Sequence, residues 1–414
     1  MSVNKSHNWK SSYHSIFDQK LQDIKNEGHY RYFNEIERKA GQYPKALHHK
    51  DGKTKEIDVW CSNDYLSMSQ NTEVMSAMKN AVDQLGAGSG GTRNISGTTH
   101  YHVILEQELA ELHNKESALL FTSGYISNEA SLSTLASTLK GCVVFSDELN
   151  HSSMIQGIRS SGATKIIFKH NDVYDLIEKI SKFDKDTPKI IAFESIYSMD
   201  GDIAPVEAIC NIAKEYNALT YLDEVHAVGM YGNKGGGISE ELGISNEIDI
   251  IEGTLAKAYG VMGGYITGNK YLVDTIRSFA SGFIFTTSIP PAVAAGASVA
   301  VNHLKHSERE RIRQKQAVSY LKQRLRKAKI SFIENKSHIV PIKIGNPDLC
   351  KRASDLLLKE YKIYVQPINY PTVPRGTERL RVTPSPMHTN EMINHLVDSI
   401  ETVWKVLKIS RMAA

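Results

Sequence analysis

Cysteine is scarce in this 414-residue chain, and its few cysteines lie far apart. Cys61, Cys142, Cys210 and Cys350 include no C-x-x-C pair. This spacing argues against a disulfide framework and against a zinc site built from thiolates. We therefore expect reduced thiols and a cytoplasmic location.

Long apolar runs and a large excess of charge of one sign are absent as well. No window reaches the roughly 18 apolar residues of a membrane span, and the N-terminus lacks the apolar core of a secretory signal. Lysine and arginine together number 49 against 46 acidic residues, which leaves a net charge of +3. This balance argues against nucleic acid or a membrane surface as a partner. With 41% hydrophobic residues, the chain can still bury a large core.

Several catalytic signatures are missing. The chain has no H-E-x-x-H, G-x-S-x-G or Walker loop, and its 16 histidines show no metal-ligand spacing, so we expect no metal. The segment GAGSGG at residues 86–91 fits G-x-G-x-x-G. A helical stretch precedes it, however, where a dinucleotide-binding loop requires a strand. We interpret this segment as a flexible loop whose glycines let the backbone approach a ligand or a partner subunit.

Short apolar runs alternate with segments of helical periodicity from about residue 105. This alternation predicts an α/β fold with a mostly parallel sheet that helices cover on both faces. A second pattern, typical of a smaller α+β domain, follows a basic helical stretch. We expect an N-terminal segment at 1–60, a large domain at 61–300 and a small C-terminal domain at 301–414. The apolar runs are SALLFTSG, GCVVFSD, TKIIFKH, KIIAFES, ALTYLDE, IDIIEGT and GGYITG.

Polar residues follow the apolar runs, and these positions are the first candidates for a site. In an open parallel sheet, ligands bind in the crevice beyond the carboxyl ends of the strands. The candidates are Ser146-Asp147, His170-Asn171, Glu194-Ser195, Asp223-Glu224 and Thr254.

Lys257 stands among small residues in GTLAKAYG, just past one of the predicted strands. A lysine whose amine joins an aldehyde must be screened from water and needs small neighbours that admit a planar cofactor. Asp223 ends another strand, with His226 close behind, and a buried carboxylate can hold a heteroaromatic nitrogen protonated. A lone lysine would be interpreted as an exposed loop residue. Together, the three residues predict a pyridoxal 5'-phosphate site.

Further residues fit such a cofactor. Thr254 and the run Thr286-Thr287-Ser288 offer hydroxyl and backbone donors for a phosphate dianion. His151 follows a predicted strand, where its ring can stack on a flat cofactor.

Longer motifs show a family resemblance that runs from about Leu21 to near the C-terminus. The chain resembles the α-oxoamine synthases, a family of fold-type I pyridoxal phosphate enzymes, and most closely those that act on glycine and succinyl-CoA. The resemblance implies a large domain with a mostly parallel, seven-stranded type of sheet and a smaller α+β C-terminal domain. The motifs are GHYRYFNEIERKAGQYPKA, VWCSNDYLSM, GAGSGGTRNISGTTHYH, FESIYSMDGD, YLDEVHAVGMYG, GTLAKAYGVMGGY, GFIFTTSIPP and PTVPRGTERLRVTPSP.

The activity that the resemblance implies is the condensation of glycine with succinyl-CoA. The products would be 5-aminolevulinate, CoA and carbon dioxide, in the first step of tetrapyrrole (haem) synthesis. The catalytic residues implied are Lys257, which would carry the cofactor and remove a glycine proton, Asp223, which would pair with the pyridinium, and His151, which would stack on the ring. His226 would hydrogen-bond the ring oxygen. Further cofactor and phosphate contacts are implied for Tyr65, Ser198, Thr254 and, across the interface of a homodimer, Thr286 and Thr287.

A second set of residues matches substrate-binding positions. Arg381, with Asn63 nearby, matches the arginine that binds the glycine carboxylate, because a guanidinium can donate two parallel hydrogen bonds to a carboxylate. Ser146 and Lys165 match positions that contact the acyl-CoA. The positions implied for the succinyl end are Arg31, Thr92, Asn94, Ile95 and Thr372.

The chain departs from the family pattern in a few places. Ser67 stands where many relatives have glycine, and Glu252 where asparagine is common. No Cys-Pro dipeptide is present, so the haem-regulatory motif of some mitochondrial relatives is absent, which favours a bacterial-type enzyme.

Other functions stay open at this point. Other enzymes of the same family condense glycine with acetyl-CoA or alanine with pimeloyl-CoA. Arg31 and TRNISGT disfavour acetyl-CoA, which has no distal carboxylate. A non-catalytic regulator with the same fold is a further alternative, although little chain precedes VWCSNDYL to hold a DNA-binding module.

Overall fold

The computed structural model describes residues 9–28 and 30–411, so residues 1–8 of the predicted N-terminal segment lie outside it. Its largest sheet has seven strands in the order β4-β10-β9-β8-β7-β5-β6. Only β10 runs antiparallel to its neighbours in this sheet. The expected α/β fold with a mostly parallel sheet is confirmed, and each predicted apolar run contributes one strand. The strands are β4 (Ser117–Phe121), β5 (Val143–Asp147), β6 (Thr164–Phe168), β7 (Lys189–Glu194), β8 (Leu219–Asp223), β9 (Ile250–Thr254) and β10 (Gly264–Gly268).

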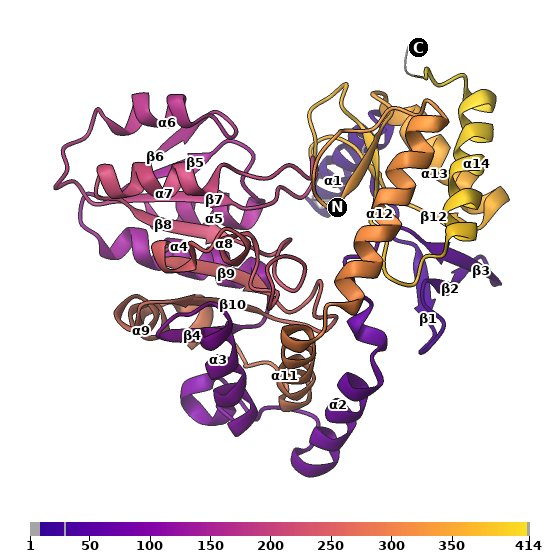
Figure 1. Cartoon of the computed structure of the whole chain (residues 1–414). Coiled ribbons are helices and arrows are strands. Elements are labelled where there is room, and N and C mark those ends of the chain that lie inside the picture. Colours follow the sequence, from indigo (N-terminus) through magenta and orange to yellow (C-terminus); the bar gives the residue numbers. More distant parts are fainter. Residues whose placement is uncertain (1–8, 29, 412–414) are drawn as a thin grey trace, which may run out of the picture.

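Helices cover both faces of this sheet because successive strand residues point to opposite sides. In β5, for example, Val143 and Phe145 join one hydrophobic core and Val144 joins the other. Figure 1 shows the helices stacked on the sheet. The first face carries α3 (His100–Leu112), α6 (Val173–Ile180), α7 (Val206–Glu215) and α11 (Pro291–His306). The second face carries α4 (Gly124–Thr138), α5 (Ser152–Ser161), α9 (Lys270–Phe279) and α10 (Ser281–Ile284).

Side-chain caps define where several helices begin. The Asn71 side chain accepts hydrogen bonds from the backbone at the start of α2, and Ser123 does so for α4. Such caps satisfy backbone N–H groups that have no partner inside the helix. Figure 1 shows α1 (Trp9–Asn26) beside the C-terminal part of the chain. The other short or peripheral elements are η1 (Met68–Gln70), α2 (Thr72–Leu85), η2 (Arg93–Gly97), α8 (Ile238–Glu241) and η3 (Ser245–Glu247).

The C-terminal part has a hydrophobic core of its own around Trp404, to which Trp60 also contributes. Two small sheets flank it, in the orders β1-β2-β3-β12 and β11-β14-β13, and Figure 1 shows this part beside the large sheet. Its helices are α12 (Arg309–Lys327), α13 (Pro347–Tyr361) and α14 (Asn390–Leu407). Its strands are β1 (Glu35–Arg38), β2 (Lys45–Lys50), β3 (Lys53–Val59), β11 (Val340–Lys343), β12 (Ile363–Tyr364), β13 (Pro367–Ile368) and β14 (Arg379–Val382).

None of the helices in residues 9–28 and 30–411 combines the length and apolarity that crossing a membrane requires. Within the same residues, no group of three or more His, Cys, Asp or Glu side chains is arranged to hold a metal ion.

Candidate active site

Three buried carboxyl groups lie side by side at the ends of neighbouring strands. Glu194 of β7 is in register with Asp223 of β8, and Asp223 is in register with Glu252 of β9. All three are almost wholly buried. Registered residues of neighbouring strands point to the same face of a sheet, and here the row faces α4 and the start of α5. The carboxyl edge of the sheet thus carries three buried acidic side chains in a row.

Asp223 is held by two hydrogen bonds. Its Oδ1 accepts from the Val225 amide at 2.9 Å and its Oδ2 from Asn128 Nδ2 at 2.7 Å. Asn128 lies on α4, and its Oδ1 in turn accepts from the Tyr221 hydroxyl at 3.0 Å. Both bonds hold the Asp223 side chain in one orientation, so the site presents a fixed carboxylate.

Lys257 lies in the loop after β9 and is partly buried. Among the described residues, no hydrogen-bond partner is recorded for its Nζ. Burial lowers the pKa of this amine, while the nearby charges of Asp223 and Glu252 act in the opposite direction. Gly260 ends the same loop with φ 72°, and a Cβ there would lie 2.1 Å from the Ser69 amide nitrogen. Close packing against the backbone at Ser69 therefore requires glycine at position 260.

A hydrogen-bonded network faces the carboxyl row from the C-terminal part. The Tyr65 hydroxyl lies 2.8 Å from His226 Nδ1, and it accepts from Arg381 Nη2 at 2.9 Å. Arg381 Nη1 donates to Asn63 Oδ1 at 3.2 Å, and its Nε donates to the Ser198 carbonyl at 2.7 Å. Burial is the main reason why the pKa of His226 lies well below its usual value, and the positive charges of Lys257 and Arg381 add to it. His226 is therefore a neutral ring at neutral pH.

His151 caps the N-terminus of α5 and keeps an exposed side chain. Its Nδ1 lies 2.7 Å from Ser153 Oγ, which also accepts from Asn128 Nδ2 at 3.1 Å. Its backbone amide donates to Glu194 Oε1 at 2.6 Å. These contacts fix the position of the ring, and the Tyr125 ring lies in an edge-to-face arrangement with it, 6.4 Å away between centroids.

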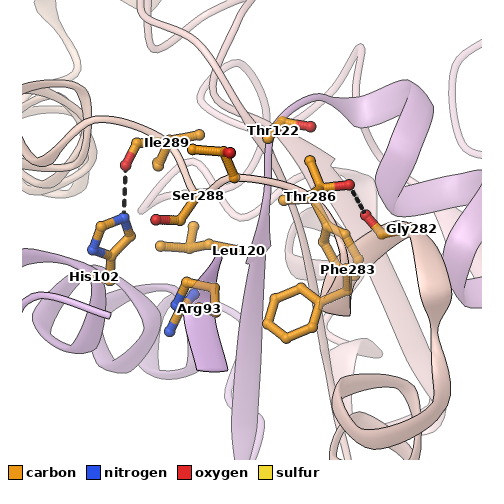
Figure 2. A pocket seen from close by; sticks show the side chains of 11 residues that line it. Arg93, His102, Leu120, Thr122, Gly282, Phe283, Thr286, Ser288 and Ile289 are labelled. Carbon is orange, nitrogen blue, oxygen red and sulfur yellow. Dashed lines mark hydrogen bonds between the residues drawn. The ribbon is translucent and has the colours of Figure 1, made fainter. Parts of the chain in front are cut away.

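The threonines expected at a phosphate lie at two separate places. Thr254 ends β9, and its hydroxyl donates to the Gly263 carbonyl at 2.9 Å. Thr286 lines a separate pocket together with Arg93 and Phe283, which Figure 2 shows. Its hydroxyl donates to the Gly282 carbonyl at 2.7 Å. Thr287 is exposed and forms an isolated bridge with Thr92. No contact between this pocket and Lys257 is recorded within the described residues.

The residues expected at the succinyl end also fall into two groups. Arg31 Nη2 donates to Thr372 Oγ1 at 3.1 Å, at a cavity of about 250 Å³ that also contains Lys351 and Gln366. The other group surrounds η2, where Thr92 Oγ1 donates to Asn94 Oδ1 at 2.6 Å. Ile95, next to Asn94, exposes 76% of its side chain.

The positions expected to contact the acyl-CoA differ in their surroundings. The Ser146 hydroxyl is buried and accepts from Asn150 Nδ2 at 2.9 Å. Lys165 is exposed on β6, which lies at the edge of the sheet.

Sequence reasoning missed several residues that shape this site. Asn128 and Ser153 hold Asp223 and His151, yet both lie on helices, where no strand-end signal identifies them. Glu252 appeared only as a departure from a family pattern. Ser67, the other departure, has φ 60°. Such a left-handed backbone explains the glycine of relatives.

Comparisons with known proteins identify the family of this chain. Residues 55–400 match the family model of aminotransferases of class I and II, so the chain belongs to that family of fold-type I pyridoxal phosphate enzymes. The 5-aminolevulinate synthase of Rhizobium meliloti is 56% identical over 97% of this chain and 100% of its own length. That of Paracoccus denitrificans is 55% identical over 96% and 98%. Within the wider family, the chain belongs to the 5-aminolevulinate synthases.

A solved structure supports the same assignment at the level of the fold. A serine palmitoyltransferase variant from S. paucimobilis, with pyridoxal phosphate and myriocin bound, superposes with a TM-score of 0.88. It is 28% identical in sequence, and the match covers 96% of this chain and 98% of that chain.

Proposed function

We propose that this protein uses pyridoxal 5'-phosphate to condense glycine with succinyl-CoA, giving 5-aminolevulinate, CoA and carbon dioxide. The observation that carries this proposal is the surroundings of Lys257. Its amine has no hydrogen-bond partner recorded among the described residues, and it lies within electrostatic reach of the Asp223 carboxylate and the Arg381 guanidinium. A nucleophile, a fixed anion and a carboxylate-binding cation thus converge on one place.

The residues present fit the cofactor. Asp223, held by two donors, would pair with the ring nitrogen, His226 with the ring oxygen, and the exposed His151 ring would stack on the ring face. Lys257 would bind its aldehyde, and Ser198 and Thr254 would contact the cofactor. When bound, the protonated ring supplies an acceptor for the electron pair released at the amino acid's α-carbon.

Arg381 is suited to bind the glycine carboxylate. A guanidinium has five N–H groups, and Arg381 uses three of them on Ser198, Asn63 and Tyr65. The remaining N–H groups, one on each Nη atom, can donate to the two oxygens of a carboxylate. The three protein contacts keep the fork in one orientation, and its charge lies within electrostatic reach of the Lys257 amine.

Lys257 is proposed as the proton acceptor. Burial lowers the pKa of its amine, which favours the neutral form that can take a proton from the glycine α-carbon onto Nζ. The Asp223 carboxylate beside it would stabilise the positive charge that develops. Tyr65, whose hydroxyl links His226 to Arg381, connects the cofactor side of the site to the substrate side. The expected contact of Tyr65 with the phosphate stays a prediction.

The acyl-CoA is proposed to enter through the cavity at Arg31 and Thr372. Contacts with Ser146 and Lys165 are part of the same proposal. Arg31 would pair with the distal carboxylate of the succinyl group, which acetyl-CoA and butyryl-CoA lack. Exchange of Arg31 for leucine should therefore lower kcat/KM for succinyl-CoA by about tenfold or more, while turnover of butyryl-CoA stays within about twofold.

The experiment for the whole proposal measures CoA release and product mass with glycine and three acyl donors: succinyl-CoA, acetyl-CoA and butyryl-CoA. We expect succinyl-CoA to be preferred and 5-aminolevulinate to appear. Equal or faster turnover of acetyl-CoA would refute the assignment. Unchanged butyryl-CoA turnover in the Arg31→Leu variant excludes misfolding as the cause of a loss.

A homodimer with the active site at the subunit interface is part of the proposal. Thr286 and Thr287 would reach the phosphate of the partner's cofactor. Because Thr287 bridges Thr92, the same arrangement would bring Thr92 and Asn94 to the partner's succinyl group. Ile95 and Phe285 expose 76% and 79% of their side chains close to this bridge, and association would bury such apolar surface.

Mixing two inactive variants tests this arrangement. One variant carries Lys257→Ala, and the other carries both Thr286→Ala and Thr287→Ala. In a mixed dimer with shared sites, one site regains Lys257 and both threonines, so activity should return. No recovery, despite exchange of subunits shown by mass spectrometry, would place all of these residues in one subunit.

The domain boundaries expected at 1–60, 61–300 and 301–414 stay predictions. The cytoplasmic location stays a prediction as well.

A further inference from the structure

Glu252 is a buried acid that the proposed reaction does not use. It is fully buried, with 0% of its surface exposed, and lies opposite Asp223 in the pairing of β8 with β9. Its packing is close, since a Cβ on Gly124 would lie 3.4 Å from Glu252 Oε1. A carboxyl group in this place requires hydrogen-bond partners for both oxygens.

The hydrogen bonds of Glu252 are incomplete if it is ionised. Its Oε1 accepts from the Ser127 hydroxyl, but its Oε2 is buried and has no hydrogen-bond partner among residues 9–28 and 30–411. Asp223 beside it already accepts from Val225 and Asn128. Ionised carboxylates only accept hydrogen bonds, whereas a protonated carboxyl also donates one. A proton on Glu252 would therefore give Oε2 a partner in Asp223.

We propose that Glu252 is a positioning residue that donates a hydrogen bond from its carboxyl group to the Asp223 carboxylate. This inference rests on the proposed function, in which Asp223 pairs with the ring nitrogen of the cofactor. Glu252 thereby holds Asp223 from the β9 side, as Asn128 holds it from α4. The negative charge of the strand ends stays on Asp223, where the cofactor requires it.

The electrostatics of the site agree with this geometry. Burial is the largest cause that holds the pKa of Glu252 well above its usual value, and the charge of Asp223 adds to it. The Ser127 hydroxyl and the Lys257 amine act in the opposite direction. The other ionisable groups that face Glu252 are the phenols of Tyr221 and Tyr265, whose pKa values burial also raises.

Glu194 on the other side of Asp223 provides a matched comparison. It is equally buried and in register with Asp223, and its pKa is likewise raised by burial. Its Oε1 is bound to the His151 amide, and its Oε2, like that of Glu252, is buried without a partner among the described residues. A hydrogen-bonding contact with the Asp223 side chain contributes to the raised pKa of Glu252, however, and no such contact contributes to that of Glu194. A role confined to Glu252 therefore predicts different effects for the two glutamates.

The test uses the holoenzyme of the wild type and of Glu252→Gln, Glu252→Met and Glu194→Gln. Gln at position 252 keeps a neutral donor, whereas Met keeps the volume and removes the donor. We expect the cofactor Kd to rise about tenfold or more in Glu252→Met, because a hydrogen bond to a charged group is lost. Glu252→Gln and Glu194→Gln should stay within about threefold of the wild type.

Infrared spectroscopy gives a readout that does not depend on activity. The wild type at neutral pH should show the C=O stretching band of a protonated carboxyl, and Glu252→Gln should lose part of it. An unchanged band in Glu252→Gln, a Glu252→Gln defect as large as that of Glu252→Met, or a normal Kd in Glu252→Met would each overturn the inference. If Glu252→Met does not fold, the infrared band and the cofactor Kd of Glu252→Gln still test the inference. Because the band reports only protonation, failure of the proposed reaction would leave this result intact.

Discussion

Tyr65 and His226 are 161 residues apart in the chain, yet the Tyr65 hydroxyl lies 2.8 Å from His226 Nδ1. The same hydroxyl accepts a hydrogen bond from Arg381. One phenol thus links the histidine of the large sheet to an arginine of the C-terminal part, and the two halves of the site are aligned through it.

Replacement of Tyr65 by phenylalanine should disturb both halves of the site at once. The buried Arg381 and His226 each lose a partner, which costs about 1–3 kcal/mol for a buried polar group. We expect a rise of about tenfold in the KM for glycine together with weaker cofactor binding, measured by steady-state kinetics and by absorbance titration. Exchange of the exposed Tyr174 (82% exposed) for phenylalanine is the control. Normal values for Tyr65→Phe would show that the phenol only fills space.

Lys257→Ala should remove both the covalent anchor and the proton acceptor. General base catalysis contributes about 10²–10⁴-fold, so turnover should fall by at least that range. Borohydride reduction followed by peptide mass mapping should label Lys257 in the wild type and leave the variant unlabelled. Label on another lysine would contradict the assignment of Lys257 as the anchor. Lys165 is an exposed lysine on β6, and its exchange for alanine tests whether the acyl-CoA contact is separate from the anchor.

Arg381→Lys should weaken glycine binding even though it keeps the positive charge. An ammonium group cannot reproduce the planar fork that contacts Ser198, Asn63 and Tyr65. The expected loss of about 1.5–3 kcal/mol corresponds to a rise in the KM for glycine of about 10–100-fold. Arg326→Lys is the control, since Arg326 pairs with Glu334 on the surface. A KM within twofold of the wild type would show that charge alone binds the carboxylate.

Two buried histidines make stability depend on pH. Burial lowers the pKa of His113 to about 3 and that of His388 to about 4, whereas an unfolded histidine titrates near 6.5. Between about pH 6.5 and 4, the unfolded state therefore binds more protons at both residues. Each histidine thus lowers the free energy of unfolding by about 1.4 kcal/mol for every pH unit of fall in this window.

The measurement is urea unfolding at several pH values for the wild type and for His388→Gln. The stability gap between the two should shrink as the pH falls from about 6.5 to 4, because the variant lacks one titrating group. Comparing the variant with the wild type cancels groups such as Glu252, whose raised pKa acts in the opposite direction. The exposed His306, changed to glutamine, is the control. A constant gap for His388→Gln would contradict the buried neutral ring.

Local sequence patterns were sufficient to predict the large sheet, and they identified Asp223 and Lys257 as candidate site residues. Apolar runs that alternate with helical segments predicted the seven strands, because the hydrophobic pattern follows local backbone geometry. The position of Asp223 at a strand end and the small neighbours of Lys257 are local features too. The cofactor could therefore be predicted from short stretches of sequence around these residues.

The residues that support Asp223 and Lys257 depend on contacts between distant segments. Asn128 reaches Asp223 from a helix, Tyr65 joins His226 to Arg381 across 161 and 316 residues, and Glu252 meets Asp223 through the register of β8 and β9. Strand register and the docking of the C-terminal part are set by packing between segments that are far apart in the chain. No local periodicity encodes them, so these contacts could not be predicted from the neighbouring residues of each position.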